Sequence, residues 1–331
     1  MTIGKRSNFV VYQQELRGGI VETLMQASAF FNSVGGAIQL STVSRRGDYN
    51  KESFFKNISS LVTRRDTSSV SAATDLPLTM DELISVKLNR KIGPVTQTYD
   101  AFSKIAMDMT PEAFSFLLGN MVGKAMQVEM LNSALRAARS ALNNIAALKH
   151  TVPTNGTLRT TDLVSGLSKR GDASTDIGVW VMHSKAYFDL FQHQIGTSAN
   201  GDIVSGVAVQ GANPLTLNRP IIVTDSDALT VSGGAGSTAY TDYFTLGLSA
   251  NAIAAENSET ERVVLDEVTG LENLVVRMQG EYAYNLGVKG FKWDVANGGA
   301  NPADAAVGTG TNWDQSFADT KALAGIVIQS R

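Results

Sequence analysis

Residues 110–149 read TPEAFSFLLGNMVGKAMQVEMLNSALRAARSALNNIAALK and carry the most regular pattern in the chain. The tripeptide Thr110-Pro111-Glu112 is typical of a helix start, with a capping hydroxyl, a proline at the first helical position and an acid near the positive end of the helix dipole. A set of apolar residues recurs at steps of three and four, the helical period, apart from the adjacent pair at 117 and 118. The set is Phe114, Leu117, Leu118, Met121, Ala125, Val128, Leu131, Leu135, Ala138, Leu142 and Ile145. The stretch predicts one helix of roughly 60 Å at about 1.5 Å per residue.

A helix of this length is longer than most globular domains need, so it serves either as a spine or as part of a coiled coil. The heptad pattern is loose, and small side chains crowd one side of the predicted helix: Ala134, Ala137, Ala138 and Ala141. We therefore expect a spine that packs on a β-sheet, within a fold of the α+β class.

The region before this helix, residues 50–107, predicts an extended excursion. Leu83–Asn89 alternates apolar and polar residues, as a half-buried strand does, and the preceding stretch 63–73 is polar. Gly93-Pro94 bends the chain, and residues 95–99 resume β character. The pattern indicates a long two-stranded loop, which needs a surface to lie on because an isolated hairpin is marginally stable in water.

The region after the helix, residues 151–260, predicts an α/β domain. Its elements are a buried strand at Ile177–Met182, a helix at Lys185–Gln194, strands at Pro220–Asp225 and Tyr243–Gly247, and a flexible Gly-rich loop at Ser232–Ser237. Two further strands are expected at Asn273–Gly280 and Glu281–Val288. Residues 296–331 look like loop with a short apolar end.

The composition fits a chain that covers much of its surface with partners. Of the 331 residues, 43% are hydrophobic and only 18% are charged, below the usual quarter. There is no cysteine, which excludes disulfides and cysteine metal sites. The sequence has no pattern of a signal peptide and no run long enough for a membrane span, so we expect no membrane partner.

The charge is unevenly spread over the chain. Residues 1–110 have a net charge of +3 (13 basic and 10 acidic side chains), and the remainder has −6 (15 and 21). The mildly basic first part could face DNA or an acidic neighbour, and the alternative is that these charges are scattered solvated side chains. Non-specific phosphate contacts are expected from Arg45, Arg46, Arg64 and Arg65.

No catalytic constellation emerges from the sequence. His183 and His193 lie ten residues apart, too far for a helical zinc pair, and Asp225 follows a strand where acids commonly serve the turn. The Gly-rich loop lacks the lysine of a P-loop, and no nucleophile elbow is present. We expect no catalytic residue, no cofactor and no metal. The alternative from a different class is a metal-dependent hydrolase that uses these two histidines and Asp225.

The order of the predicted parts resembles the major capsid proteins of tailed bacteriophages, which have the Hong Kong 97-type fold. Each of the stretches that carry this resemblance is weak alone, and their order along the chain is what matters. They are DELISVKLNR (81–90) with Gly93-Pro94 and Asp100-Ala101-Phe102, WVMHSKAY (180–187), NRPIIVTD (218–225) and YAYNLGVKGF (282–291).

The resemblance implies a division of the chain into named parts. These are an N-terminal arm (1–53), an extended β-hairpin loop (54–107), a spine helix of a peripheral domain (108–154), an axial domain (155–260), closing strands of the peripheral domain (261–295) and a C-terminal tail (296–331). In such shells the axial domains meet at the centres of hexamers and pentamers, and the loop lies across a neighbour. Gly93 and Pro94 are the candidate hinge.

The implied function is a non-enzymatic one: self-assembly into an icosahedral shell that encloses double-stranded DNA, in a virion assembled in the host cytoplasm. The implied partners are other copies of the chain, a scaffolding protein, a portal, a decoration protein and the packaged DNA. The nearest alternative is an encapsulin-type nanocompartment, which has the same fold and holds an enzyme cargo.

Overall fold

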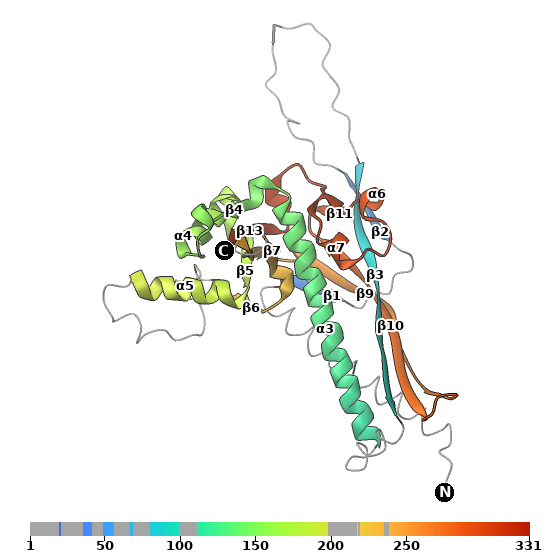
Figure 1. The fold of residues 1–331 in the computed structure, drawn as a ribbon. Helices are drawn as coiled ribbons and strands as arrows, with labels where there is room; N and C mark the ends of the chain where they lie inside the picture. Colours follow the sequence, from blue (N-terminus) through green and yellow to red (C-terminus); the bar gives the residue numbers. More distant parts are fainter. Residues whose placement is uncertain are drawn as a thin grey trace.

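The structure is a computed structural model that describes residues 20, 36–41, 49–55, 67–68, 80–98, 111–197, 217, 219–234 and 238–331. Within these residues, two β-sheets lie beside one long helix, α3 (Pro111–Asn143). Figure 1 shows α3 running alongside the long strands of one sheet, with the second sheet and the helices α4 (Thr160–Ser168) and α5 (Ser184–Thr197) near its C-terminal end.

The first sheet has five strands in the order β1-β9-β10-β3-β2. β10 (Val275–Val288) pairs antiparallel with both β9 (Ile253–Val268) and β3 (Met80–Thr98). The edge strands are β1 (Ile38–Ser41), which is parallel to β9, and β2 (Tyr49–Phe55), which is antiparallel to β3. The long central strands form the ribbon that extends beside α3 in Figure 1.

The second sheet has six strands. Its path is β4 (Lys149–Thr151), β13 (Gly325–Ser330), β8 (Tyr240–Ser249), β5 (Ile177–Met182) and β6 (Ile221–Val223), and β7 (Thr230–Gly233) pairs with the first part of β8. Two short strands, β11 (Phe291–Trp293) and β12 (Trp313–Gln315), form a separate pair. The remaining helices among the described residues are short: α6 (Val295–Gly298), α7 (Asp304–Val307) and the 3-10 turns at 146–148, 153–155, 171–176, 227–229, 310–312 and 320–322.

The predicted long helix is confirmed, and it is shorter than expected. α3 begins at Pro111, the first helical position of the start signal, while Thr110 lies outside the described residues. The helix ends at Asn143, because residues 146–148 form a 3-10 turn and residues 149–151 pair with β13 as strand β4. Its 33 residues span about 50 Å at about 1.5 Å per residue.

Two strand predictions need correction. Residues 86–98 do not remain in a two-stranded loop, because they pair with β10 and therefore belong to the five-stranded sheet. The two strands expected at 273–280 and 281–288 are one continuous strand, β10. Strand β9 was not expected at all: its sequence is largely polar, so it lacks the apolar alternation that marks a half-buried strand.

The end of the chain differs most from the prediction, which made residues 296–331 a tail. Residues 325–330 form β13, which lies between β4 and β8 in the six-stranded sheet. Ile326, Val327 and Ile328 are fully buried. The guanidinium of Arg170, itself buried, donates to the carbonyl of Leu323 at 3.0 Å and so ties down the approach to this strand.

Small and aromatic residues fix how α3 contacts its surroundings. Ala134, Ala137, Ala138 and Ala141 are buried, which confirms that their side of the helix packs on the fold. Near the same end, the buried Trp293 and Trp313 meet edge to face with ring centroids 4.9 Å apart. The Ser140 hydroxyl donates to the carbonyl of Val307 at 2.8 Å. The C-terminal part of α3 is therefore enclosed by elements from late in the chain.

Candidate functional site

The candidate DNA-contacting arginines, Arg45, Arg46, Arg64 and Arg65, lie outside the described residues. The hinge candidates Gly93 and Pro94 lie inside β3, where the register against β10 shifts between Met278 and Gly280. Gly93 has φ +74°, and a Cβ there would lie 2.7 Å from the nitrogen of Val95 and 2.9 Å from the carbonyl oxygen of Met278. Glycine is therefore required at this irregularity of the sheet.

The histidines and acids of the hydrolase alternative do not form a metal site in the described part of the chain. His183 Nε2 lies 4.0 Å from Asp225 Oδ1, and the Asp225 side chain is 77% exposed. His193 lies on α5, and His150, which is not part of this alternative, lies 3.3 Å from Asp162. Among the described residues there is no group of three or more His, Asp or Glu side chains placed to hold a metal ion. None of the described helices is long and apolar enough to cross a membrane.

The N-terminal half of α3 presents an exposed apolar face. Leu117, Met121 and Val128 are 46%, 61% and 57% exposed, and their spacing puts them on one side of the helix. Scattered exposed apolar side chains are ordinary, but a row along one helix face indicates a contact surface. The opposite side of this half is buried through Val122, Met126 and Met130.

A polar network joins this half of α3 to the five-stranded sheet. The carboxylate of Glu129 accepts hydrogen bonds from the hydroxyls of Tyr282 (2.8 Å) and Tyr284 (3.0 Å), both on β10, and forms an ion pair with Arg90 of β3 at 2.7 Å. Arg90 also donates to Ser133 at 3.0 Å and to Asp304 at 2.6 Å. Helix α3, strands β3 and β10 and helix α7 thus meet at one cluster.

The charges of the network are fixed by their surroundings. Burial raises the pKa of Tyr282 and of Tyr284, and the nearby Glu129 carboxylate raises both further, so the phenols stay protonated and donate. Burial works against the charge on Arg90, but the Glu129 carboxylate and the hydrogen bond to Asp304 outweigh it and leave the pKa of Arg90 above its usual value. The network is therefore a fixed, directional joint with no group poised for proton transfer.

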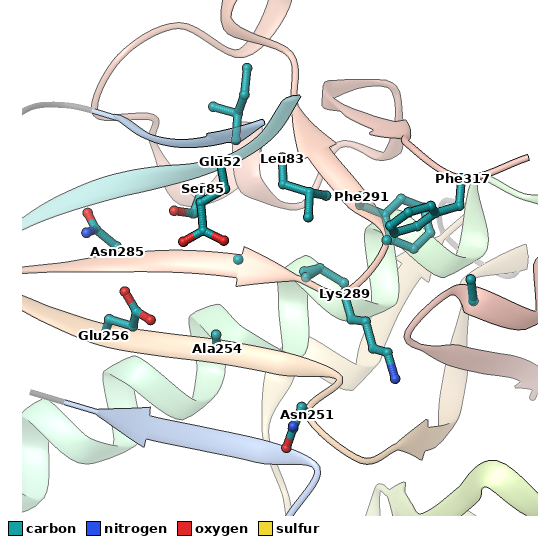
Figure 2. Close-up of a pocket in the computed structure, with 15 residues that line it drawn as sticks. Glu52, Leu83, Ser85, Asn251, Ala254, Glu256, Asn285, Lys289, Phe291 and Phe317 are labelled. Atoms are coloured by element: carbon teal, nitrogen blue, oxygen red, sulfur yellow. The ribbon is translucent and has the colours of Figure 1, made fainter. Parts of the chain in front are cut away.

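A pocket of about 520 Å³ is lined by residues of β2, β3, β9 and β10 of the same sheet, together with Phe291, Phe317 and Ala322 (Figure 2). We call it the Asn285 pocket, after the β10 residue on its wall. Polar side chains on neighbouring strands line one part of it, and apolar side chains line another. The polar set is Glu52, Ser85, Glu256 and Asn285, and the apolar set includes Leu83, Val288, Phe291 and Phe317.

The sequence did not indicate either the network or the Asn285 pocket. Tyr282 lies 153 residues after Glu129, and the pocket gathers residues from β2, β3, β9 and β10. The one available signal was Glu129 itself, because an acid among the apolar positions of a predicted helix calls for a partner.

Comparison with known proteins identifies the family. The model of the Gp13-like family, described as Major capsid protein 13-like, matches residues 8–327. The chain therefore belongs to this family of phage major capsid proteins, which are structural subunits of the virion capsid and not enzymes. No curated protein matches the sequence.

Solved structures with the same fold come from phage capsids. The chain is similar to the capsid asymmetric unit of cyanophage Pam1 (12% identity, TM-score 0.52, covering 90% of this chain and 89% of that one). It is also similar to the capsid of Ralstonia phage GP4 (13%, 0.52, 90% and 88%) and to a chain of Mycobacterium phage Bobi (11%, 0.51, 93% and 89%). The fold is thus the Hong Kong 97-type fold that the resemblance implied.

Proposed function

We propose that this capsid subunit assembles as hexamers and pentamers of an icosahedral shell that encloses double-stranded DNA. The observation that carries the proposal is the exposed apolar row Leu117, Met121 and Val128 on a helix whose other half is enclosed. Such a row is covered when a neighbouring copy packs on it. Because each subunit contacts several neighbours, individually weak contacts add up to a closed shell.

The parts named in the sequence analysis keep their proposed roles. The axial domain (155–260) lies at the centres of the rings, and β4 and β13 join its six-stranded sheet from outside that range. Helix α3 and the five-stranded sheet form the peripheral domain, and the loop between β2 and β3 lies across a neighbour. Gly93 and Pro94 form a hinge in β3. A scaffolding protein, a portal and a decoration protein are the proposed partners besides further copies of the chain.

Replacing Met121 and Val128 together by serine tests the assembly surface. We expect the double variant to fold, with unchanged near-UV circular dichroism, because both side chains are exposed in the subunit. In negative-stain electron microscopy it should form few or no closed shells when it is co-expressed with its neighbouring genes. The matched control is Val164→Ser, a change at an exposed apolar residue on α4. Normal shells from the double variant would contradict the proposal.

Arg45, Arg46, Arg64 and Arg65 are proposed to contact the packaged DNA through its phosphates. Such contacts carry no sequence preference and weaken as salt rises. Replacing all four by glutamine should make shells release DNA at lower salt than the wild-type shells do. DNA retention that is unchanged across a salt series would exclude this role.

A further inference from the structure

The turn that joins β9 to β10, residues 269–274, carries two exposed leucines at one end of the five-stranded sheet. We propose that this turn of one copy docks on the exposed apolar row of α3 in a second copy, and that an ion pair flanks the contact. The inference rests on the proposed function and deepens it, because it names the segment of the neighbouring subunit that covers the row.

The first step is the exposure of the turn. Leu271 and Leu274 are 59% and 52% exposed, although leucine is among the residues most often buried. They follow Gly270, whose φ of +89° bends the chain between the two strands. Figure 1 shows this turn at the far end of the β9–β10 ribbon, away from the six-stranded sheet. Two leucines held at the end of a protruding ribbon indicate a contact with another molecule.

The second step is the shape of the receiving surface. A hollow of about 450 Å³ lies beside the apolar row, and its wall includes Ala125, Val128, Asn132 and Arg136. A flat helix face touches a partner side chain on one side only, whereas a hollow surrounds it with more atoms within van der Waals distance. The open half of α3 therefore offers a protruding leucine side chain a place to insert.

The third step is the charge beside each apolar surface. Lys124 lies on the same face of α3 as Met121 and Val128, and it lines the hollow. Glu272 lies between the two leucines of the turn. Both side chains are exposed, and neither makes a hydrogen bond or an ion pair with another described residue. An apolar turn with a carboxylate thus complements an apolar row with an ammonium group.

The turn comes from a second copy, because a subunit does not cover its own row. The row and the two leucines are exposed within one and the same subunit, so the turn does not pack on α3 of its own chain. A major capsid protein is surrounded by copies of itself. Every copy carries both surfaces, so the turn of one copy on the row of the next forms a heterologous contact that each further copy can repeat.

Disulfide trapping tests the contact directly, because the chain has no cysteine of its own. Shells of the variant Met121→Cys/Leu271→Cys are assembled under reducing conditions, oxidised after purification and run on a non-reducing gel. The double variant should form disulfide-linked dimers and higher multimers, and neither single variant should form dimers. Monomers alone from the double variant would overturn the proposal. Dimers of Met121→Cys alone would join two helices, and dimers of Leu271→Cys alone would join two turns, so either would also overturn it.

A second pair of cysteines keeps the test independent of one variant. Val128→Cys with Leu274→Cys probes the same contact and should give the same multimers. The matched control combines Leu271→Cys with Val164→Cys, a change at an exposed apolar residue on α4, and should stay monomeric. Absence of multimers from both test pairs, or equal yields from the control pair, would overturn the proposal.

Charge reversal tests the ion pair. Lys124→Glu places like charges at the contact and should lower the disulfide yield of the first pair about two- to fivefold at low salt, as expected of an exposed pair. Adding Glu272→Lys should restore the yield, which a structural role of either residue alone would not do. The control, Lys169→Glu, changes an exposed lysine at the end of α4 and should have no effect. A yield that the second reversal leaves low would overturn the charge pairing on which the choice of this turn rests.

The two proposals fail in different ways. Wild-type subunits that form no shells would overturn the proposed function and this inference with it. Closed shells in which neither cysteine pair forms multimers would leave the proposed function intact and remove this contact.

Discussion

The two halves of α3 follow the same helical period and have opposite surroundings. From Ser115 to Met130 the helix has five exposed residues, including Leu117, Met121 and Val128. From Leu131 to Asn143 it has none. The second half is enclosed by β13, the Trp293–Trp313 pair and the turns at 227–229 and 310–312, whereas the first half is joined to the five-stranded sheet through the Glu129 network.

The difference separates two tasks within one helix. The enclosed half stabilises the subunit, because its burial is complete before any partner binds. The open half contributes less to the folded subunit and leaves apolar surface available for a neighbour. The Glu129 network holds the open half to its sheet through directional bonds, so this half keeps its orientation without being enclosed.

The largest expected effect is on stability when the enclosed half loses a side chain. Leu142→Ala should lower the free energy of unfolding of the subunit by about 2–5 kcal/mol, because the fully buried Leu142 leaves a cavity. Met121→Ala, on the open half, should change it by less than about 0.5 kcal/mol. Urea unfolding of both variants measures the difference, and similar losses at the two positions would erase the distinction between the halves.

A smaller effect is expected when a side chain is enlarged by the same change on each half. Ala138→Leu should cost about 1–3 kcal/mol, because the buried Ala138 has no room for the added atoms. Ala125→Leu, at an exposed position, should stay within about 0.5 kcal/mol, since alanine and leucine have similar helix propensities. Equal melting temperatures for the two variants would show that the second half is less tightly packed than the structure shows.

The smallest effect concerns the polar network and its pH dependence. Burial alone would raise the pKa of Asp304, but hydrogen bonds and charges from Arg90 and Arg136 leave it below the ordinary value. A carboxylate with a lowered pKa stabilises the fold above about pH 4, and this stability is lost as the pH falls through its folded-state pKa. Asp304→Asn should therefore lower stability by less than about 1 kcal/mol at neutral pH, because the side chain is 53% exposed. In unfolding curves the difference from the wild type should vanish near about pH 2; a difference that stays constant would rule out the ion pair as its source.

Elements with strong local patterns could be predicted from the sequence. The helix period placed α3, and the apolar run at 177–182 and the strand at 243–247 lie within β5 and β8. These patterns are visible in the sequence because each element buries either one face or its whole surface over many consecutive residues. The resemblance to phage capsid proteins added the order of the parts, and the family match confirms the class of protein.

The features that could not be predicted depend on contacts between distant segments. Strand β9 is polar because much of its surface faces away from the core. Its sequence therefore lacks the apolar alternation from which its pairing with β10 could have been predicted. Residues 296–331 look like a tail because they contain many glycines and only short elements. The short apolar run of β13 becomes recognisable as a strand only beside β4 and β8, which bury it. The Asn285 pocket needs four strands in register before its residues meet.

The place of β13 also has a consequence for the timing of synthesis. The ribosome makes residues 1–324 before it makes this strand, yet β13 lies between β4 and β8, which are made much earlier. Until β13 has been synthesised, the edges of β4 and β8 that face it have no partner strand. Contacts between residues so far apart in the sequence also form slowly. A chain that stops anywhere before residue 325 lacks the strand that joins these edges. A prematurely terminated product therefore cannot complete the six-stranded sheet.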